Sequence, residues 1–200
     1  MQKTRGRPRQ FDEQAAKQAV LGVFWEKGFA ATSLDDLSKA TGMVRPSLYG
    51  AFGSKVEMYL MSMDVFLGTL SEVRAGLAAS ETVEGAFENF LLGMIEVYFS
   101  SNTDKQLGCF LVGTAIAQAP SNPEIREALS ARLERLNNML GMTLSSLAPQ
   151  ATKADIDFAV QQGAAVLHSI AVRARAGESR EKLSNFAMQS AKFISTLIKA

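Results

Sequence analysis

Apolar residues recur every three to four positions along most of the chain, which is the spacing of one face of an α-helix. In residues 32–55 this pattern predicts two short helices with a turn between them, followed by the start of a third helix. Ser33 and Asp36 have the spacing of a capping box at the start of the first helix. Gly42 suits the left-handed position that ends this helix, and Pro46 suits the first turn of the next one.

The second short helix has two different faces. Leu48 and Phe52 fall on its inner face, whereas Arg45, Ser47 and Tyr49 point away from it. A short helix that presents polar side chains beside a turn is typical of a helix-turn-helix DNA-binding unit. An ordinary hairpin of two helices inside a helical bundle has the same local pattern, so this stretch alone leaves both interpretations open.

The apolar pattern predicts further helices on both sides of this stretch. Helical spacing is found at 12–27, 56–78, 82–100, 106–119, 123–146, 152–176 and 179–200. The stretch 106–119 is apolar nearly all round, which predicts a buried helix. No strand pattern competes. We therefore predict an all-α fold, in which an N-terminal three-helix helix-turn-helix domain (residues 1–55) is joined by a long helix to a C-terminal helical bundle (residues 56–200).

The composition narrows the class of protein. With 47% hydrophobic and 20% charged residues, the 200-residue chain can bury a sizeable core. No apolar run approaches the ~20 residues that cross a bilayer, and none resembles a secretory signal. The single cysteine, Cys109, excludes an internal disulfide framework, and one cysteine with one histidine argues against a Cys/His zinc site. We expect a soluble cytoplasmic protein that has no membrane partner, metal or cofactor.

Charge is distributed unevenly, although the net charge is only +1. Residues 1–55 carry nine Lys/Arg against five Asp/Glu, whereas the rest of the chain carries 12 against 15. This asymmetry favours a basic module that binds a polyanion. Arg5, Arg7 and Arg9 belong to a slim segment like the basic arms that enter A·T-rich minor grooves, although a solvated chain end has the same composition.

Three segments in order, GRPRQFD, VFWEKGFAATSLDDLSKATG and RPSLYGAFGSK, resemble the DNA-binding domain of the TetR family of bacterial transcription regulators. The resemblance covers roughly residues 5–60. It implies phosphate contacts from Thr32, Ser33, Tyr49 and Lys55, and contacts with base edges from Arg45, Pro46 and Ser47. General chemistry agrees, because hydroxyls and helix N-termini donate to phosphate and an arginine fork reads guanine. Val44 departs from the family pattern, which usually has a capping Ser or Thr at this position.

The resemblance also implies what the chain does. A protein of this kind is a homodimer that binds a palindromic operator in double-stranded DNA and is released from it by a small-molecule effector. The implied mechanism is a population shift, in which the effector favours a separation of the two DNA-binding domains that does not fit the operator. We therefore expect a ligand-responsive repressor and not an enzyme.

The C-terminal bundle holds two further groups of candidate residues. Its last two helices resemble the pair with which the family forms a four-helix bundle across a twofold axis. The candidates for this dimer interface are Gly163, Ala165, Ser169, Phe186, Phe193 and Leu197, with packing inside one chain as the alternative. The candidates for an apolar effector pocket are Met94, Tyr98, Cys109, Phe110 and His168, although aromatic and methionine residues at helical spacing are also typical of a core.

Cys109 has two alternative roles. A subset of the family senses electrophiles or oxidants through a cysteine in a context like LGCFLVG, which would make this chain a redox sensor. A lone cysteine among apolar residues is usually inert, because burial raises the pKa of its thiol. Cys109 and His168 would be the reactive pair of a hydrolase, with Asp155 or Asp157 as the orienting acid, but no sequence spacing supports this arrangement.

Overall fold

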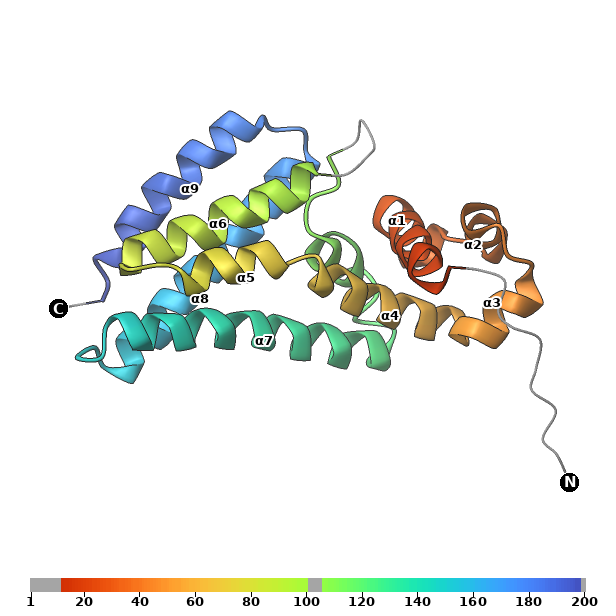
Figure 1. The fold of residues 1–200 in the computed structure, drawn as a ribbon, viewed down its shortest axis with the longest axis horizontal. Helices are drawn as coiled ribbons and strands as arrows, with labels where there is room; N and C mark the ends of the chain where they lie inside the picture. Colours follow the sequence, from red (N-terminus) through yellow and green to blue (C-terminus); the bar gives the residue numbers. More distant parts are fainter. Residues whose placement is uncertain (1–11, 101–105, 199–200) are drawn as a thin grey trace, which may run out of the picture.

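The computed structural model describes residues 12–100 and 106–198, and over these residues it consists of helices without strands. In Figure 1, α1–α3 lie at one end of an elongated molecule, α5–α9 form a bundle at the other end, and α4 links the two groups. The α-helices are α1 (Glu13–Ala31), α2 (Leu34–Thr41), α3 (Arg45–Phe52), α4 (Lys55–Gly68), α5 (Ser71–Ala78), α6 (Val83–Phe99), α7 (Pro123–Leu147), α8 (Lys153–Arg175) and α9 (Arg180–Ser195). A π-helical turn, η1 (Leu111–Ala115), precedes α7. The predicted all-α fold is confirmed, and none of the described helices is long and apolar enough to cross a membrane.

Capping side chains start the N-terminal helices. Asp12 accepts hydrogen bonds from two backbone N–H groups in the first turn of α1. Ser33 and Asp36 form the predicted capping box at the start of α2, and Ser54 and Glu57 form a second box at the start of α4. Because each box satisfies backbone N–H groups that have no partner inside the helix, it fixes where the helix begins.

The single helix expected over residues 56–78 is wrong: the structure has two helices, α4 and α5, in this range. The backbone carbonyl of Leu67 accepts hydrogen bonds from the N–H of Leu70 (3.3 Å) and from Nη1 of Arg74 (3.0 Å), so it leaves the regular helical pattern. Gly68 stands at the break and weakens the helix there. The apolar period continues unchanged across the break, which is why the sequence pattern does not reveal it.

The buried helix expected over 106–119 is also wrong. Residues 106–109 are not helical, and η1 is followed by turns. Gly108 has φ 62°, and a Cβ at this position would lie 2.4 Å from the carbonyl oxygen of Ala171, so the segment requires glycine here. Nor is the segment buried all round, because Ile116 is 53% exposed.

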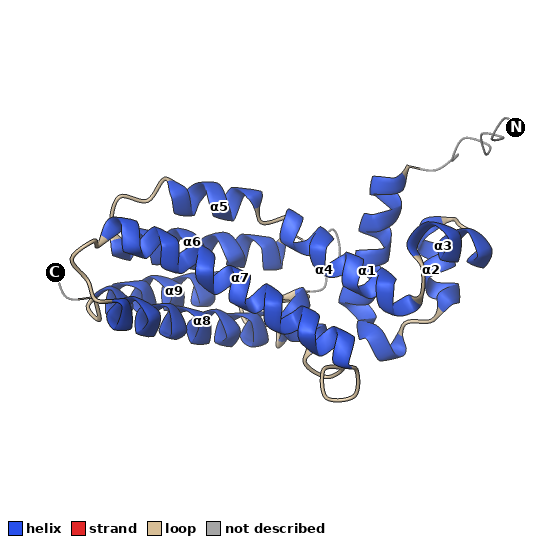
Figure 2. Ribbon diagram, turned by 90° about the horizontal axis from the view of Figure 1, so that it is seen from below, coloured by secondary structure: helices blue, strands red, loops and turns tan. Residues whose placement is uncertain are grey.

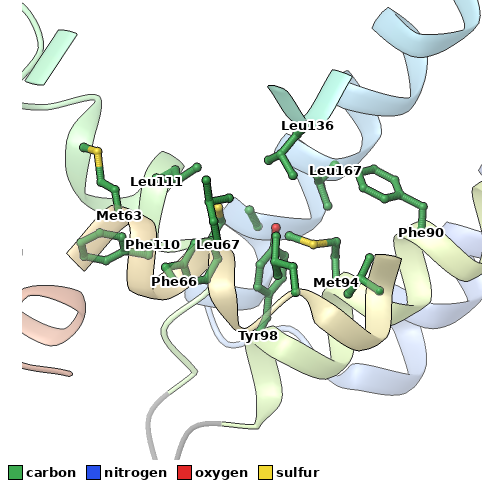
Figure 3. Close-up of a cluster of buried hydrophobic side chains, with 14 of the residues drawn as sticks. Met63, Phe66, Leu67, Phe90, Met94, Tyr98, Phe110, Leu111, Leu136 and Leu167 are labelled. Carbon is green, nitrogen blue, oxygen red and sulfur yellow. The ribbon is translucent and has the colours of Figure 1, made fainter. Parts of the chain in front are cut away.

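One apolar core extends from the N-terminal helices into the bundle. Figure 2 shows α4 running from α1–α3 into the bundle. Figure 3 shows the middle of this core, where the labelled side chains come from α4 (Met63, Phe66, Leu67), α6 (Phe90, Met94, Tyr98), the η1 segment (Phe110, Leu111), α7 (Leu136) and α8 (Leu167). The α1–α3 end and the bundle are therefore joined by packing as well as by the chain.

Candidate nucleic-acid interface

The helix-turn-helix unit consists of α2 and α3, which are held in place by their apolar side chains. Leu37 of α2 and Leu48 of α3 are fully buried, and Phe52 is nearly so. Gly42, between the helices, has φ 68°, the left-handed conformation that the sequence predicts. Val44 precedes α3 and provides no side-chain cap, as its departure from the family pattern predicts.

The outer face of α3 carries Arg45, Pro46, Ser47 and Tyr49, all of which are exposed. Figures 1 and 2 show α3 at the end of the molecule opposite the bundle. A single α-helix fits the major groove of B-DNA, which is about 12 Å wide. The residues predicted to meet base edges and phosphate from α3 thus lie together on one accessible surface.

Arg45 is paired with Asp35, which the sequence analysis did not select. Nε of Arg45 lies 3.0 Å from Oδ1 of Asp35, and Nη2 lies 2.6 Å from each carboxylate oxygen. This hydrogen bonding, together with the opposite charge, raises the pKa of Arg45. The pair positions the guanidinium at the start of α3. Asp35 and Arg45 are ten residues apart, and this spacing alone does not predict a contact. The contact depends on the angle of the turn between α2 and α3.

The start of α3 has a second residue whose role the sequence analysis missed. Val44 is 66% exposed and lies directly before Arg45. An exposed apolar side chain beside a groove-facing helix is suited to contact with a thymine methyl group. The missing side-chain cap at this position marked Val44 as unusual, but only the structure shows that it faces outward.

The N-terminus of α2 is occupied by its own cap. Oγ of Ser33 accepts a hydrogen bond from the N–H of Asp36 (3.1 Å) and donates one to its carboxylate (2.8 Å). Nζ of Lys27 lies 2.5 Å from the same carboxylate. The hydrogen bonds from Lys27 and Ser33 hold the pKa of Asp36 well below its usual range. The hydroxyl of Ser33, a predicted phosphate contact, therefore has partners within the protein.

Two other predicted phosphate contacts are partly withdrawn from the surface. Thr32 is buried, and its hydroxyl donates to the carbonyl of Gly28 at 2.7 Å. Nζ of Lys55 lies 4.6 Å from the centre of the Phe29 ring, and burial lowers the pKa of this lysine. The three arm residues Arg5, Arg7 and Arg9 lie outside the described residues.

The residues expected to line an effector pocket are mostly packed in the core. Met94, Tyr98 and Phe110 are fully buried, and the Phe110 ring lies 5.9 Å from the Phe66 ring of α4, centroid to centroid. His168 is half-buried on α8, and burial lowers its pKa. For these residues the structure shows the core packing that the sequence analysis kept as the alternative.

Cys109 is 4% exposed, and burial raises the pKa of its thiol. A thiol with a raised pKa contains little of the thiolate form that reacts with oxidants and electrophiles. Within the described residues no hydrogen bond joins Cys109 to His168. Neither the redox-sensor role nor the hydrolase role is therefore favoured by the structure.

The residues of α8 and α9 that were predicted to form the dimer interface differ in how exposed they are. Gly163 is buried inside the chain, where a Cβ would lie 2.6 Å from the Phe87 ring, so its small size serves internal packing. Ser169, Phe186 and Leu197 are half-buried, whereas Ala165 and Phe193 are exposed. Three exposed apolar residues of the same two helices were missed: Phe158, Val172 and Met188. On α8 an exposed residue recurs every seven positions, at Phe158, Ala165 and Val172, which is the repeat of a helix-packing seam.

Comparison with known proteins agrees with this geometry. The profile of the bacterial regulatory proteins of the tetR family matches residues 18–60, which include α2 and α3 and most of α1. The HTH-type transcriptional repressor ComR of Escherichia coli (strain K12) is 27% identical over 204 residues, which cover 100% of this chain and 96% of that protein. Residues 18–60 therefore match the DNA-binding domain of the tetR family, and the whole chain is similar to a transcriptional repressor.

Further known proteins are similar over nearly the whole chain. The HTH-type transcriptional repressor BdcR of Escherichia coli (strain K12) is 25% identical over 196 residues, covering 97% of this chain and 94% of BdcR. The solved structure of a cysteine mutant of the TetR-family regulator CifR, complexed with 26 bp double-strand operator DNA, has a TM-score of 0.82 at 26% identity. It covers 93% of this chain and 98% of that one. The likeness therefore includes the bundle as well as the helix-turn-helix unit.

Proposed function

We propose that this chain is a transcriptional repressor that binds a palindromic operator as a homodimer and releases it when a small molecule binds the bundle. The observation that carries the proposal is that α3 has one buried apolar face and one exposed polar face. Leu48 and Phe52 anchor the helix from inside, and Arg45, Ser47 and Tyr49 face outward at the end of the molecule. The names of ComR and BdcR as repressors, and the CifR complex with operator DNA, support the same function.

The proposed contacts fall into two classes. Arg45, Pro46 and Ser47, with Val44, would meet base edges in the major groove, and Arg45 would read guanine through two hydrogen bonds. Tyr49 and the backbone at the starts of α2 and α4 would bind phosphate. In the DNA-free protein, Asp35 holds the side chain of Arg45 in one orientation. To bind a base, the guanidinium of Arg45 would give up some or all of its hydrogen bonds to Asp35.

A homodimer supplies the second α3 that a palindromic site requires. Two such helices have to be about 34–36 Å apart to enter successive major grooves on one side of the duplex. The exposed apolar residues of α8 and α9 (Phe158, Val172, Met188 and Phe193) provide a surface on which two copies would pack as a four-helix bundle. This assembly would place the α1–α3 ends of the two copies outside the bundle, where they are free to bind DNA.

The function is tested by selecting bound duplexes from a random pool and measuring affinity for the selected site by fluorescence anisotropy. We expect Arg45→Ala to cost about 1–3 kcal/mol of discrimination at one base pair. Tyr49→Ala should weaken binding to all duplexes alike. Arg126→Ala, which removes an exposed arginine from α7, is the matched control. A selection that yields no preferred sequence, or an Arg45→Ala protein that behaves like the control, would overturn the proposal.

A further inference from the structure

A pocket of about 610 Å³ lies where α4 ends, α5 begins and α7 passes. It is lined by Asp64, Leu67, Gly68, Leu70, Arg74, Arg135, Leu136 and Met139, none of which was among the predicted pocket residues. Figure 1 shows α4 and α5 lying along α7 at this point, which is where the chain passes from the DNA-binding end into the bundle. A volume of this size is typical of small-molecule sites.

The floor of the pocket is apolar. Leu67, Leu70 and Leu136 are buried, and Met139 is half-buried. These side chains come from the last turn of α4, the turn before α5, and α7. An apolar portion of a ligand would replace water over this floor and be bound there by the hydrophobic effect.

The rim of the pocket is cationic. Arg74 and Arg135 both line it, and neither forms an ion pair with a carboxylate in the part of the chain that the structure describes. Arg74 is anchored by one hydrogen bond from Nη1 to the carbonyl of Leu67. The acid at the rim, Asp64, is already bound by Arg132, with Nη2 2.8 Å from Oδ1. Arg74 and Arg135 thus have no ion pair of their own among the described residues, beside an apolar floor.

A buried polar group lies beneath the floor. The hydroxyl of Tyr98 is fully buried and has no well-formed hydrogen bond among the described residues; the polar group that it interacts with is the thiol of Cys109. In Figure 3 this hydroxyl points toward Leu136, which lines the pocket together with Leu67. A ligand that parted these two side chains would give the hydroxyl a partner.

We propose that this pocket is the effector site and that its ligand is an apolar carboxylate, with the carboxylate bound by Arg74 and Arg135 and the apolar portion on the floor. Arginine is suited to this role because its planar fork matches the two oxygens of a carboxylate. The hydroxyl of Tyr98 would bind a second polar atom deeper in the site. The proposal rests on the proposed function, because it names the chemistry of the effector that releases DNA.

The position of the site couples it to DNA binding. Leu67 belongs to the last turn of α4, and the other end of α4 begins at Lys55 beside α3. A ligand that displaces Leu67 toward α1 or away from Leu136 moves the end of a helix whose start supports the helix-turn-helix unit. The carboxylate therefore binds one position of α4 better than another, which is the differential affinity that a population shift requires.

The test uses the full-length protein and measures ligand binding by calorimetry without DNA, and DNA binding by anisotropy without and with ligand. The probes are octanoate, decanoate and phenylbutyrate, each compared with the primary alcohol of the same skeleton. We expect the carboxylates to bind more tightly than the alcohols. Arg135→Ala should weaken carboxylate binding by about tenfold or more, as loss of a charged hydrogen bond does. It should leave alcohol binding unchanged. Arg126→Ala on the same helix is the matched control.

Two further variants separate charge from shape. Arg74→Lys keeps the charge but not the fork, and should weaken carboxylate binding less than Arg74→Gln. Tyr98→Phe should weaken ligands that carry a second polar atom and leave octanoate unaffected. Near-ultraviolet circular dichroism identifies any variant that loses its packing.

The outcomes distinguish this proposal from the proposed function. Carboxylate binding that depends on Arg135 and lowers DNA affinity supports it. The carboxylate proposal is overturned if carboxylates bind no better than alcohols, or if they bind equally well to Arg135→Ala. If the protein still binds DNA selectively in that case, the proposed function stands. Carboxylates that bind as expected but leave DNA affinity unchanged overturn the assignment of the pocket as the effector site. Absence of selective DNA binding in the ligand-free protein overturns the proposed function instead.

Discussion

Nε1 of Trp25 in α1 donates a hydrogen bond to the backbone carbonyl of Gly108, 3.0 Å away, and so connects the DNA-binding end to the segment before η1. The Trp25 ring also meets Phe66 and Phe110 edge to face, at centroid distances of 5.1 and 6.3 Å. A second buried bond joins the hydroxyls of Tyr59 and Thr114 at 2.6 Å. Together these contacts make the junction between the two ends of the molecule a packed interface with directed hydrogen bonds. These contacts connect the bundle directly to α1 and α4.

Trp25→Phe should destabilise the protein by about 1–3 kcal/mol, because it keeps an aromatic ring in the core but leaves the Gly108 carbonyl buried without its donor. Urea denaturation followed by far-ultraviolet circular dichroism measures the change in free energy of unfolding. Thr114→Val provides a comparison, because it removes the other junction bond. If Trp25→Phe unfolds at the same urea concentration as the wild type, the bond does not contribute to the junction.

Tyr59 makes the stability of the protein fall in alkaline solution. Burial raises the pKa of Tyr59 to about 12. In the unfolded chain this hydroxyl loses its proton near pH 10, while the folded protein keeps it, so the unfolded state binds fewer protons in this window. Unfolding free energy should therefore decrease as pH rises from about 10 to 12, and Tyr59→Phe should decrease less steeply. Equal slopes in urea titrations at several pH values would contradict this assignment.

The sequence predicted those features that depend on local chemistry. The capping box of Ser33 with Asp36, the left-handed Gly42, and the inward Leu48 and Phe52 were all confirmed. Each depends on residues a few positions apart. The helices α6, α7, α8 and α9 were also found near their predicted bounds, because long apolar periods survive changes in tertiary context.

Features that depend on tertiary contacts were not predictable in this way. The break between α4 and α5 lies within an unbroken apolar period, and it is held by Arg74 bonding back to Leu67. The contact of Arg45 with Asp35 depends on how two helices cross. Gly163 was assigned to an interface between chains because small residues allow close approach, but the close neighbour is Phe87 of the same chain. The spacing of apolar residues shows which face of a helix is buried, but it does not show whether the same chain or a second copy buries it.

Asp35→Ala should increase the affinity for DNA of any sequence while reducing the preference for the operator. The change removes a negative charge that would lie near phosphate and frees Arg45 from the position that Asp35 gives it. The effect on stability should be under about 1 kcal/mol, because the pair is exposed. Anisotropy with the operator and with a scrambled duplex, at several salt concentrations, measures both effects. Asp157→Ala on α8 removes the same charge away from α3 and should change neither affinity.

The exposed apolar residues of α8 and α9 (Phe158, Val172, Met188 and Phe193) should determine whether the chain forms a dimer. Val172 and Phe193 are 60% and 65% exposed, and glutamate at either position would bring two like charges together across a twofold interface. We expect Val172→Glu and Phe193→Glu to sediment as folded monomers that bind the operator more weakly. Met142→Glu is the control, because Met142 is 75% exposed and belongs to α7, outside the two helices of the proposed interface. Dimers of unchanged stability in both seam variants would show that another surface holds the two copies together.

Cys109 should be unreactive in the folded protein. Its thiol is almost completely buried, and burial raises its pKa, so both access and thiolate content are low. Iodoacetamide followed by mass spectrometry should modify Cys109 slowly in buffer and rapidly in denaturing urea. Release of DNA by hydrogen peroxide can be measured for the wild type and for Cys109→Ser. We expect the same release from both proteins, because any release would come from oxidation of methionines, which both proteins contain. Rapid alkylation in buffer, together with release that depends on Cys109, would instead show that the segment around η1 opens and that the chain senses oxidants.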